Sequence, residues 1–190
     1  MKVLGINYGG HDTSAAIMID GELVAACEEE RYTKDKHTRV FPSNAIADCL
    51  KMADLTVGDV DRAAFCYKPS LLLEIEGPVR KMRRDLLTEE QFKETLQQET
   101  GYVGPVDFHE HHVCHLASAY YPSGFNDALL MSNDGVGEIL CSLYGKGTYG
   151  GITPVFAENE WPHSLGLLYS AVTFYLGWKP MYDEGITMGL

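Results

Sequence analysis

Two stretches of similar organisation decide the fold: LGINYGGHDTSAAIMIDGELVAACEEE at residues 4–30 and ALLMSNDGVGEILCSLYGKGTYGGITPVFAENE at residues 128–160. Each predicts an apolar strand, a polar loop that contains glycine, a second strand, a glycine turn and a third strand. In the first stretch, the Asp20-Gly21 dipeptide favours a tight hairpin turn. Each stretch is followed by an amphipathic helix, the first after Ser43 and the second over residues 164–178. The sequence therefore predicts an internal duplication.

The first copy continues well beyond its helix, whereas the second copy stops there. Residues 60–67 predict a strand, residues 71–99 one or two helices broken near Gly77-Pro78, residues 104–110 a short strand, and residues 111–121 a helix that Pro122 ends. Alternating strands and helices indicate an α/β fold. The sequence thus predicts one complete lobe at residues 1–125 and an incomplete second lobe at residues 126–190.

The composition excludes several classes of protein. The chain has 190 residues, 45% of them hydrophobic and 22% charged, which is typical of a globular protein. Its net charge is −12, and beyond residue 100 only Lys146 and Lys179 are basic, so we expect no nucleic-acid partner. Five scattered cysteines without a CxxC pair favour a reducing, cytoplasmic setting, and we read them as small buried hydrophobic residues. No apolar run approaches membrane-spanning length, so we expect no membrane partner.

Four of the seven histidines lie at residues 109–115. His111 and His115 are four positions apart, so on a helix they share one face and can direct nitrogens at one ion. A polar helix end with solvent-exposed histidines gives the same spacing. A metal site becomes the better interpretation because an apolar strand leads to Asp134, whose carboxylate can be a third ligand. This set suits iron(II), zinc or manganese, and His112 points elsewhere.

Two polar loops are candidates for binding the phosphates of a nucleotide. In SNDGVGE, residues 132–138, Gly135 and Gly137 let backbone amides approach a phosphate, and Glu138 belongs to the same candidate cofactor site. A plain hairpin turn would give the same pattern. The interpretation gains weight from a matching loop in the first copy, because two such loops facing each other could clamp one nucleotide.

The loop of the first copy, NYGGHDTSAA at residues 7–16, adds a histidine. Gly9, Gly10 and Asp12 are candidate cofactor-binding residues. His11 is the candidate catalytic residue, because imidazole is the side chain suited to accept a proton near neutral pH. A solvent-exposed hairpin with a capping aspartate is the alternative.

Two basic clusters and one aromatic series complete the candidates. RYTKDKHTR at residues 31–39 predicts an anion-recognition patch, whereas RKMRR at residues 80–84 predicts a solvated helix face. The acidic run at residues 28–30 could orient Arg31 or cover an edge strand with charge. The aromatic residues between Tyr169 and Trp178 are expected in the core.

The chain resembles the O-carbamoyltransferases of the nodulation and antibiotic-tailoring type in motifs that follow one another over nearly its whole length. They are GINYGGHDTSAA, EEERYTKDKH, HHVCHLASAYYPSGF, SNDGVGE, HSLGLLYSAVTFYLG and DEGITMGL. This family is similar to the enzymes that make threonylcarbamoyl-modified tRNA. The resemblance implies the actin-like ATPase fold, which is ribonuclease-H-like and has two duplicated lobes.

The resemblance also implies a reaction. A separate C-terminal domain would convert ATP and carbamoyl phosphate to carbamoyl adenylate, and the actin-like domain would transfer the carbamoyl group to a hydroxyl of a small molecule. His111, His115 and Asp134 match the metal-ligand positions of the family, where the best-known members hold iron. His11 matches a histidine with a catalytic or adenylate-contacting role.

The chain departs from the family at its end. Ile186 stands where the family has a lysine, so any contact by that lysine is lost. The rest of the second lobe, a further aspartate ligand and the C-terminal domain are expected in cis or on a partner chain, and the 190 residues alone are not expected to turn over. An open sheet edge would favour a homodimer. The alternatives are another actin-like ATP user, such as a threonylcarbamoyl transferase or a kinase, and a non-catalytic nucleotide-binding or interaction module.

Overall fold

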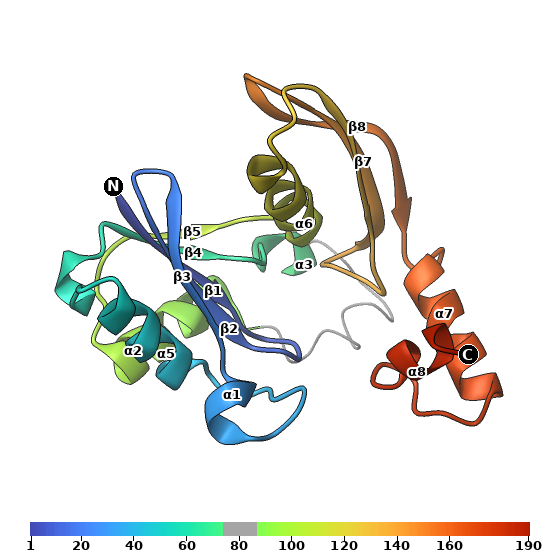
Figure 1. Cartoon of the computed structure of the whole chain (residues 1–190), viewed down its shortest axis with the longest axis horizontal. Helices are drawn as coiled ribbons and strands as arrows, with labels where there is room; N and C mark the ends of the chain where they lie inside the picture. The colour runs from blue at the N-terminus through green and yellow to red at the C-terminus, as the bar shows by residue number, and fades with distance from the viewer. Residues whose placement is uncertain (74–86) are drawn as a thin grey trace. The chain divides into compact units, whose positions relative to one another are not determined.

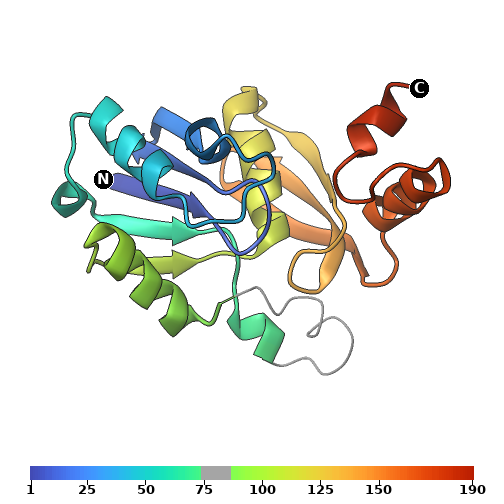
Figure 2. The ribbon, with the colours of Figure 1, turned by 90° about the horizontal axis from the view of Figure 1, so that it is seen from below.

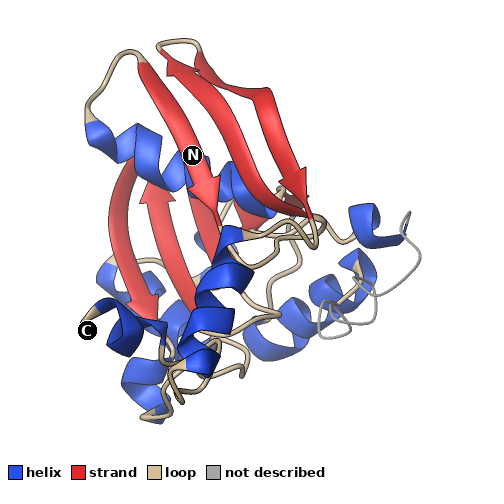
Figure 3. Ribbon diagram, turned by 90° about the vertical axis from the view of Figure 1, so that its right-hand side faces the viewer, coloured by secondary structure: helices blue, strands red, loops and turns tan. Residues whose placement is uncertain are grey.

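A computed structural model describes residues 1–73 and 87–190 (Figure 1). It contains two compact units, Met1–His109 and Glu110–Leu190. Helices and strands follow one another through both units, as Figure 3 shows, so the predicted α/β class is confirmed. The basic cluster at residues 80–84 and the helix break near Gly77-Pro78 lie outside the described residues.

The first unit is built on a five-stranded sheet of order β3-β2-β1-β4-β5. Strands β1, β2 and β3 form an antiparallel meander, whereas β4 and β5 run parallel to β1. Asp20 and Gly21 have φ angles of 51° and 89°, the left-handed pair that a two-residue hairpin turn requires. The strands are β1 (Lys2–Asn7), β2 (Ser14–Ile19), β3 (Glu22–Glu28), β4 (Arg62–Phe65) and β5 (Val106–Phe108).

Helices cover one face of this sheet and bury its apolar side. Figure 1 shows α2 and α5 on the same side of the strands. Helix α2 places Ile46 against the meander, and α5 stacks Phe92 on Phe65 with ring centroids 3.9 Å apart. All three side chains are buried, so this face holds the core of the unit. The helical segments are α1 (Glu30–Thr33), α2 (Ser43–Met52), η1 (Val57–Asp59), α3 (Ser70–Leu73) and α5 (Glu89–Thr100).

Helix α2 begins without a side-chain cap from its own N-cap residue, Pro42. The Ser43 hydroxyl donates to Glu99 instead. The buried carboxylate of Glu29 accepts hydrogen bonds from the Ala45 backbone N–H at 2.8 Å and from the Asn44 side chain at 2.5 Å. Glu29 therefore satisfies the orphan donors of α2 and fastens this helix to the end of β3.

The second unit repeats the meander on a smaller scale. Strands β6, β7 and β8 pair antiparallel in that order, and α6 packs on β6 and β7. The antiparallel meander thus occurs in both units, which agrees with the predicted internal duplication. The elements are α6 (His111–Tyr120), η2 (Tyr121–Ser123), β6 (Ala128–Asn133), β7 (Leu140–Thr148), β8 (Gly151–Glu160), α7 (Leu165–Tyr175) and α8 (Glu184–Met188).

Helix α6 belongs with the second compact unit, because its apolar side chains pack with β6 and β7. We had placed residues 111–121 at the end of the first lobe. The division into lobes at residues 125 and 126 rests on the sequence repeat and stays a prediction.

Helix α7 is less buried than its sequence suggests. It packs against α8, as Figure 2 shows for the C-terminal end of the chain. Phe174 and Tyr175 are 70% and 87% exposed, and the predicted apolar side is exposed as well at Leu165 and Leu168. The expectation that the aromatic series lies in the core is therefore wrong for these described residues, because no larger sheet covers the helix within the second unit. Among the described residues, no helix has both the length and the apolar composition to cross a membrane.

Candidate functional site

Helix α6 and the turn after β6 bring together the three predicted metal ligands. His111 Nε2 lies 3.0 Å from Asp134 Oδ2, and His115 Nε2 lies 3.5 Å from the same oxygen. The two imidazole Nε2 atoms are 2.9 Å apart. One turn of helix therefore aligns the two rings as the i, i+4 spacing predicted.

The contact between the two imidazoles tests whether this cluster fits a metal. Two neutral rings that meet nitrogen to nitrogen can make at most one hydrogen bond, and two charged rings repel each other. Three donor atoms within 4.8 Å of one another can instead surround one divalent ion. Two imidazoles and one carboxylate form a donor set typical of zinc and of non-haem iron(II), so the residues fit such an ion.

Asp134 is held in place by its neighbours on both sides. Its second carboxylate oxygen accepts the Gly135 N–H at 2.6 Å, and its carbonyl accepts the Ser164 hydroxyl at 2.8 Å. Burial by itself raises the pKa of Asp134, but the hydrogen bonds from His111, His115 and Gly135 outweigh it and hold that pKa far below its usual range. The carboxylate is therefore ionised, as a metal ligand must be.

His112 points away from this cluster, as predicted, and anchors α6 to the sheet. The residue is 1% exposed, with Nε2 2.8 Å from the Leu140 carbonyl and Nδ1 2.8 Å from the Ser132 hydroxyl. Burial lowers the pKa of His112, which favours the neutral ring. Because a carbonyl only accepts, Nε2 donates to Leu140 and Nδ1 accepts from Ser132.

The predicted phosphate-binding residues of the second loop have structural partners. Glu138 is 4% exposed, and its carboxylate oxygens accept the His111 backbone N–H at 3.1 and 3.2 Å, so it caps α6. A Cβ on Gly137 would lie 3.0 Å from the His112 ring and 3.2 Å from His111 Cβ. A Cβ on Gly135 would meet nothing within 4 Å among the described residues. Gly137 thus permits the close approach of α6, and Gly135 alone leaves its surroundings open.

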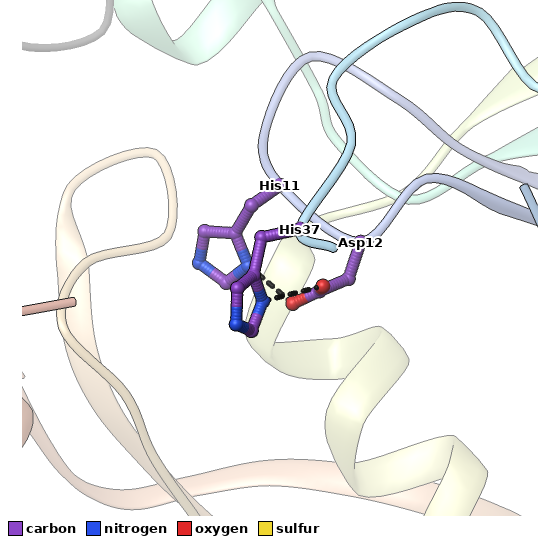
Figure 4. A group of neighbouring side chains, drawn as sticks. All are labelled: His11, Asp12 and His37. Atoms are coloured by element: carbon purple, nitrogen blue, oxygen red, sulfur yellow. Dashed lines mark hydrogen bonds and ion pairs between the residues drawn. The ribbon is translucent and has the colours of Figure 1, made fainter. Parts of the chain in front are cut away.

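The first loop forms a second cluster, which Figure 4 shows. His11 Nδ1 lies 2.5 Å from Asp12 Oδ2, and His37 Nδ1 lies 2.9 Å from Asp12 Oδ1. Partial burial by itself raises the pKa of Asp12, but the bonds from both histidines outweigh it and lower that pKa. Gly9 has a φ of 91°, so glycine suits the turn that precedes this cluster.

Gly10 has an ordinary contact: a Cβ there would lie 3.5 Å from the Tyr67 hydroxyl. The predicted nucleotide contacts of Gly9, Gly10 and Asp12 stay predictions. The expectation that the loops at residues 7–16 and 132–138 face each other across a nucleotide stays a prediction as well.

The charged segment after β3 is largely engaged within its own neighbourhood. Glu28 pairs with Arg31 at 2.8 Å, and Lys34 donates to the Arg31 carbonyl at 2.6 Å. One of our two interpretations of the acidic run, that it orients Arg31, therefore fits Glu28, whereas Glu29 caps α2. An anion patch at residues 31–39 stays a prediction.

The cysteines do not take part in either cluster. All five are free, and Cys49 and Cys141 are fully buried. Burial raises the pKa of the Cys114 thiol to about 11, so the residue on the histidine helix is a neutral thiol near neutral pH. The positions of Cys49 and Cys141 agree with the interpretation of the cysteines as small buried hydrophobic residues.

Sequence reasoning did not assign the observed roles of three residues. It gave His37 no role, placed Glu138 with the cofactor, and did not recognise Glu29 as a helix cap. His37 lies in the loop that follows α1, 25 residues after Asp12, and no local pattern in the sequence pairs the two. Glu29 lies within an acidic run and Glu138 lies between a glycine and an isoleucine, and neither pattern indicates that the carboxylate turns inward to a helix start.

Comparison with known proteins gives the family. A family model described as "Carbamoyltransferase N-terminus" matches residues 2–75 and 80–190. The chain belongs to the carbamoyltransferase N-terminus family. It is 33% identical to the nodulation protein NolNO of Sinorhizobium fredii over 95% of its own length and 27% of that protein. It is 36% identical to an uncharacterized protein of Synechocystis sp. over 99% of its length and 34% of that protein.

This carbamoyltransferase-family chain therefore spans about a third or less of the length of these curated relatives. Among solved structures it is similar to YeaZ from Pseudomonas aeruginosa, with 14% identity and a TM-score of 0.46 over 85% of this chain and 67% of that one. It is also similar to the ROK hexokinase from Thermus thermophilus, with 14% identity and a TM-score of 0.43 over 95% of this chain and 66% of that one.

Proposed function

We propose that the chain is the metal- and nucleotide-binding N-terminal part of an O-carbamoyltransferase. In this proposal, carbamoyl adenylate made from ATP and carbamoyl phosphate donates its carbamoyl group to a hydroxyl of a small molecule. The observation that carries the proposal is the convergence of His111, His115 and Asp134 in a chain of the carbamoyltransferase family. A plain kinase of the actin-like class has no need of two imidazole ligands.

His111, His115 and Asp134 would hold the metal, with iron(II), zinc and manganese as the candidates. A divalent ion bound there would supply Lewis-acid stabilisation of negative charge on the adenylate phosphate. His112 and Glu138 hold α6 in place through buried hydrogen bonds, so they fix the direction in which the two ligand rings point. Such supporting bonds keep a metal site ordered before the ion binds.

His11 would act as the general base. It accepts the proton of the acceptor hydroxyl while the oxygen attacks the carbamoyl carbon, and the bond from that carbon to the phosphate oxygen breaks. The products are the carbamate ester, AMP and a protonated His11, which returns its proton to solvent. The backbone of the loop at residues 132–138 is the candidate contact for the adenylate phosphate, although in this structure the Gly135 and Gly137 N–H groups donate to Asp134 Oδ1 and to the Leu140 carbonyl.

Metal content of the 190-residue chain tests the ligand set. We expect about one iron(II) or zinc per chain after anaerobic loading and dialysis, and loss of the ion in His111→Ala and His115→Ala. His109→Ala is the matched control, because this exposed histidine lies two positions before His111 and takes no part in the cluster. Wild-type occupancy in both ligand variants would overturn the assignment.

Calorimetry with a non-hydrolysable carbamoyl-adenylate analogue separates the proposal from its alternatives. We expect binding that weakens when the metal is removed by a chelator. Equal binding of ATP with and without metal would favour another actin-like ATP user. Absence of both metal and nucleotide binding would favour a non-catalytic interaction module.

We further propose that α7 is covered by additional protein, either the rest of the enzyme in cis or a partner chain. The exposed apolar side chains of α7 support this, because monomeric proteins rarely expose so large an apolar patch. A second copy of this chain is the alternative. Sedimentation of the 190-residue chain distinguishes the two, since self-association that Leu168→Glu abolishes would favour the homodimer.

A further inference from the structure

We infer that His37 is a positioning residue that works through Asp12 to hold His11 in the tautomer with its proton on Nδ1. In that tautomer, His11 Nε2 carries the free lone pair and faces away from the carboxylate. This inference rests on the proposed role of His11 as the base and names the groups that prepare it.

Each imidazole of the cluster meets its own oxygen of one carboxylate. Asp12 Oδ2 is 2.5 Å from His11 Nδ1, and Asp12 Oδ1 is 2.9 Å from His37 Nδ1. An ionised carboxylate can only accept, so both Nδ1 atoms donate and both Nε2 atoms are left unprotonated in the neutral rings. Free histidine prefers the proton on Nε2, so Asp12 imposes the less common tautomer.

The backbone turns Asp12 toward both rings. Its φ of 59° is left-handed, a region that aspartate enters more readily than most residues. The Asn7 side-chain amide donates to the Asp12 carbonyl at 2.8 Å and holds this turn. The carboxylate can therefore reach the ring of its own neighbour, His11, and still face His37.

The loop that carries His37 is tied to the first loop by a backbone hydrogen bond as well, although 25 residues separate His37 from Asp12. The Thr13 N–H donates to the Thr38 carbonyl at 3.5 Å, and the Glu29 N–H donates to the Thr13 carbonyl at 2.9 Å. The His37 backbone N–H donates to the Glu30 carboxylate at 3.2 Å. His37 is thus held where its ring fixes the second oxygen of Asp12, which limits rotation of that carboxylate.

A metal ion is the competing occupant, because His11, Asp12 and His37 also place three donor atoms within 4.8 Å. The pairing of atoms favours a hydrogen-bonded relay, in which His37 and His11 each donate to the Asp12 carboxylate, over a metal site. In this cluster each nitrogen already has a carboxylate oxygen as partner, whereas in the α6 cluster two nitrogens face each other. The ring centroids of His11 and His37 are 6.2 Å apart, compared with 4.4 Å for His111 and His115.

Nitrogen-15 NMR of the histidine rings in the metal-free chain, followed with rising pH until the ring shifts no longer change, tests the inference. The protonated and unprotonated ring nitrogens have well separated shifts. We expect His11 and His37 mostly in the Nδ1–H form and His112 in the Nε2–H form as an internal reference. Asp12→Ala should return His11 and His37 to the Nε2–H form that free histidine prefers.

Variants of His37 separate positioning from general structure. His37→Phe keeps a ring but removes the donor, and we expect a smaller Nδ1–H fraction at His11; His37→Gln keeps a donor and should restore that fraction. His109→Phe is the control and should leave the His11 tautomer unchanged. A predominantly Nε2–H His11 in the wild type, or equal His11 tautomers in all His37 variants, would overturn the inference.

A zinc titration completes the test. Zinc at stoichiometric concentration should shift His111 and His115 and leave His11 and His37 unchanged, whereas a shift of His11 and His37 would replace the relay by a metal site. Failure of the proposed function, seen as no metal at His111 and His115, leaves the tautomers of His11 and His37 as they are. The two failures are therefore distinguishable.

Discussion

The two histidine clusters of this chain use the same residue types with opposite pairing of atoms. In the α6 cluster, His111 and His115 present Nε2 and meet each other as well as Asp134. In the first loop, His11 and His37 present Nδ1 and meet separate oxygens of one carboxylate. In the α6 cluster two imidazole nitrogens face each other, and a bound cation would accept the lone pairs of both. In the first cluster each Nδ1–H donates to its own carboxylate oxygen, so the contacts need no ion. The two clusters contain the same residue types, so the identity of the contacting atoms distinguishes a candidate metal site from a hydrogen-bonded cluster.

The two clusters also differ in how the chain supports them. His111 has a 12% exposed side chain and lies on a helix held by the buried His112 and Glu138, whereas His11 has a 47% exposed side chain in a loop. His115 and Asp134 are 47% and 42% exposed, so the support of the α6 cluster comes from its helix rather than from burial of the whole ligand set. An imidazole on a loop instead needs a partner to fix its ring, and Asp12 and His37 fill that role.

The largest expected effect comes from removing the carboxylate of the α6 cluster, and the matched substitution is the removal of the carboxylate of the first cluster. Asp134→Ala should lower zinc affinity by more than the about 10–100-fold that loss of an outer-shell partner costs. Asp12→Ala should leave zinc affinity unchanged, because the first cluster takes protons and no ion. Competition with a fluorescent chelator measures both constants. An equal loss in the two variants would remove the distinction between the clusters.

The next effect concerns the start of α2, where the Glu29 carboxylate caps the helix. Glu29→Ala leaves the Ala45 N–H at the start of α2 without its partner, and we expect a loss of about 1–3 kcal/mol in the free energy of unfolding. Glu28→Ala is the matched control, because this neighbouring carboxylate is 51% exposed and pairs with Arg31 at the surface. We expect a change within about 0.5 kcal/mol there. Urea unfolding followed by circular dichroism compares them, and equal midpoints would contradict the buried cap.

The repeat and the ligand set could be predicted from the sequence because both depend on local periodicity. Apolar alternation and the Asp20-Gly21 turn define the meander, and the i, i+4 spacing places His111 and His115 on one helix face. Asp134 could be predicted as the third ligand as well, since it lies where a strand of apolar residues ends.

Contacts between segments that are distant in the sequence could not be predicted in the same way. The partnership of His37 with Asp12 depends on where the loop after α1 folds back. The inward turn of Glu29 and Glu138 depends on helix starts that lack a cap of their own. The apolar pattern of α7 predicts a face suited to burial, but the pattern does not indicate which segment covers that face.

A smaller effect is expected at the two glycines of the second loop. Gly137→Ala would bring a Cβ to 3.0 Å from the His112 ring, so α6 or the loop must move. We expect a loss of about 1–3 kcal/mol in stability, as for other overpacked sites, together with weaker zinc binding. Gly135→Ala, whose Cβ meets no described atom within 4 Å, should leave both quantities nearly unchanged. Equal effects of the two substitutions on stability and zinc affinity would contradict the role of Gly137 in the close approach of α6.

The smallest expected effect is the acid titration of Asp12. Its pKa in the folded chain is lower than its ordinary value of about 3.9, because the bonds from His11 and His37 outweigh partial burial. The carboxylate therefore contributes stability that is fully present above about pH 4 and is lost as pH falls through the lowered pKa. At an exposed pair this contribution is about 0.2–1 kcal/mol, so a local measurement is needed.

The carboxyl carbon-13 shift of Asp12 provides that measurement. We expect a midpoint below the ordinary aspartate value in the wild type, and a rise toward that value in His37→Phe, because one of the two bonds to the ionised form is gone. The same midpoint should persist in His109→Phe, where both bonds remain. His11 and His37 are the histidines that face the carboxylate. An unchanged midpoint in His37→Phe would mean that His11 alone holds Asp12, and the first cluster would then reduce to a simple pair of neighbours.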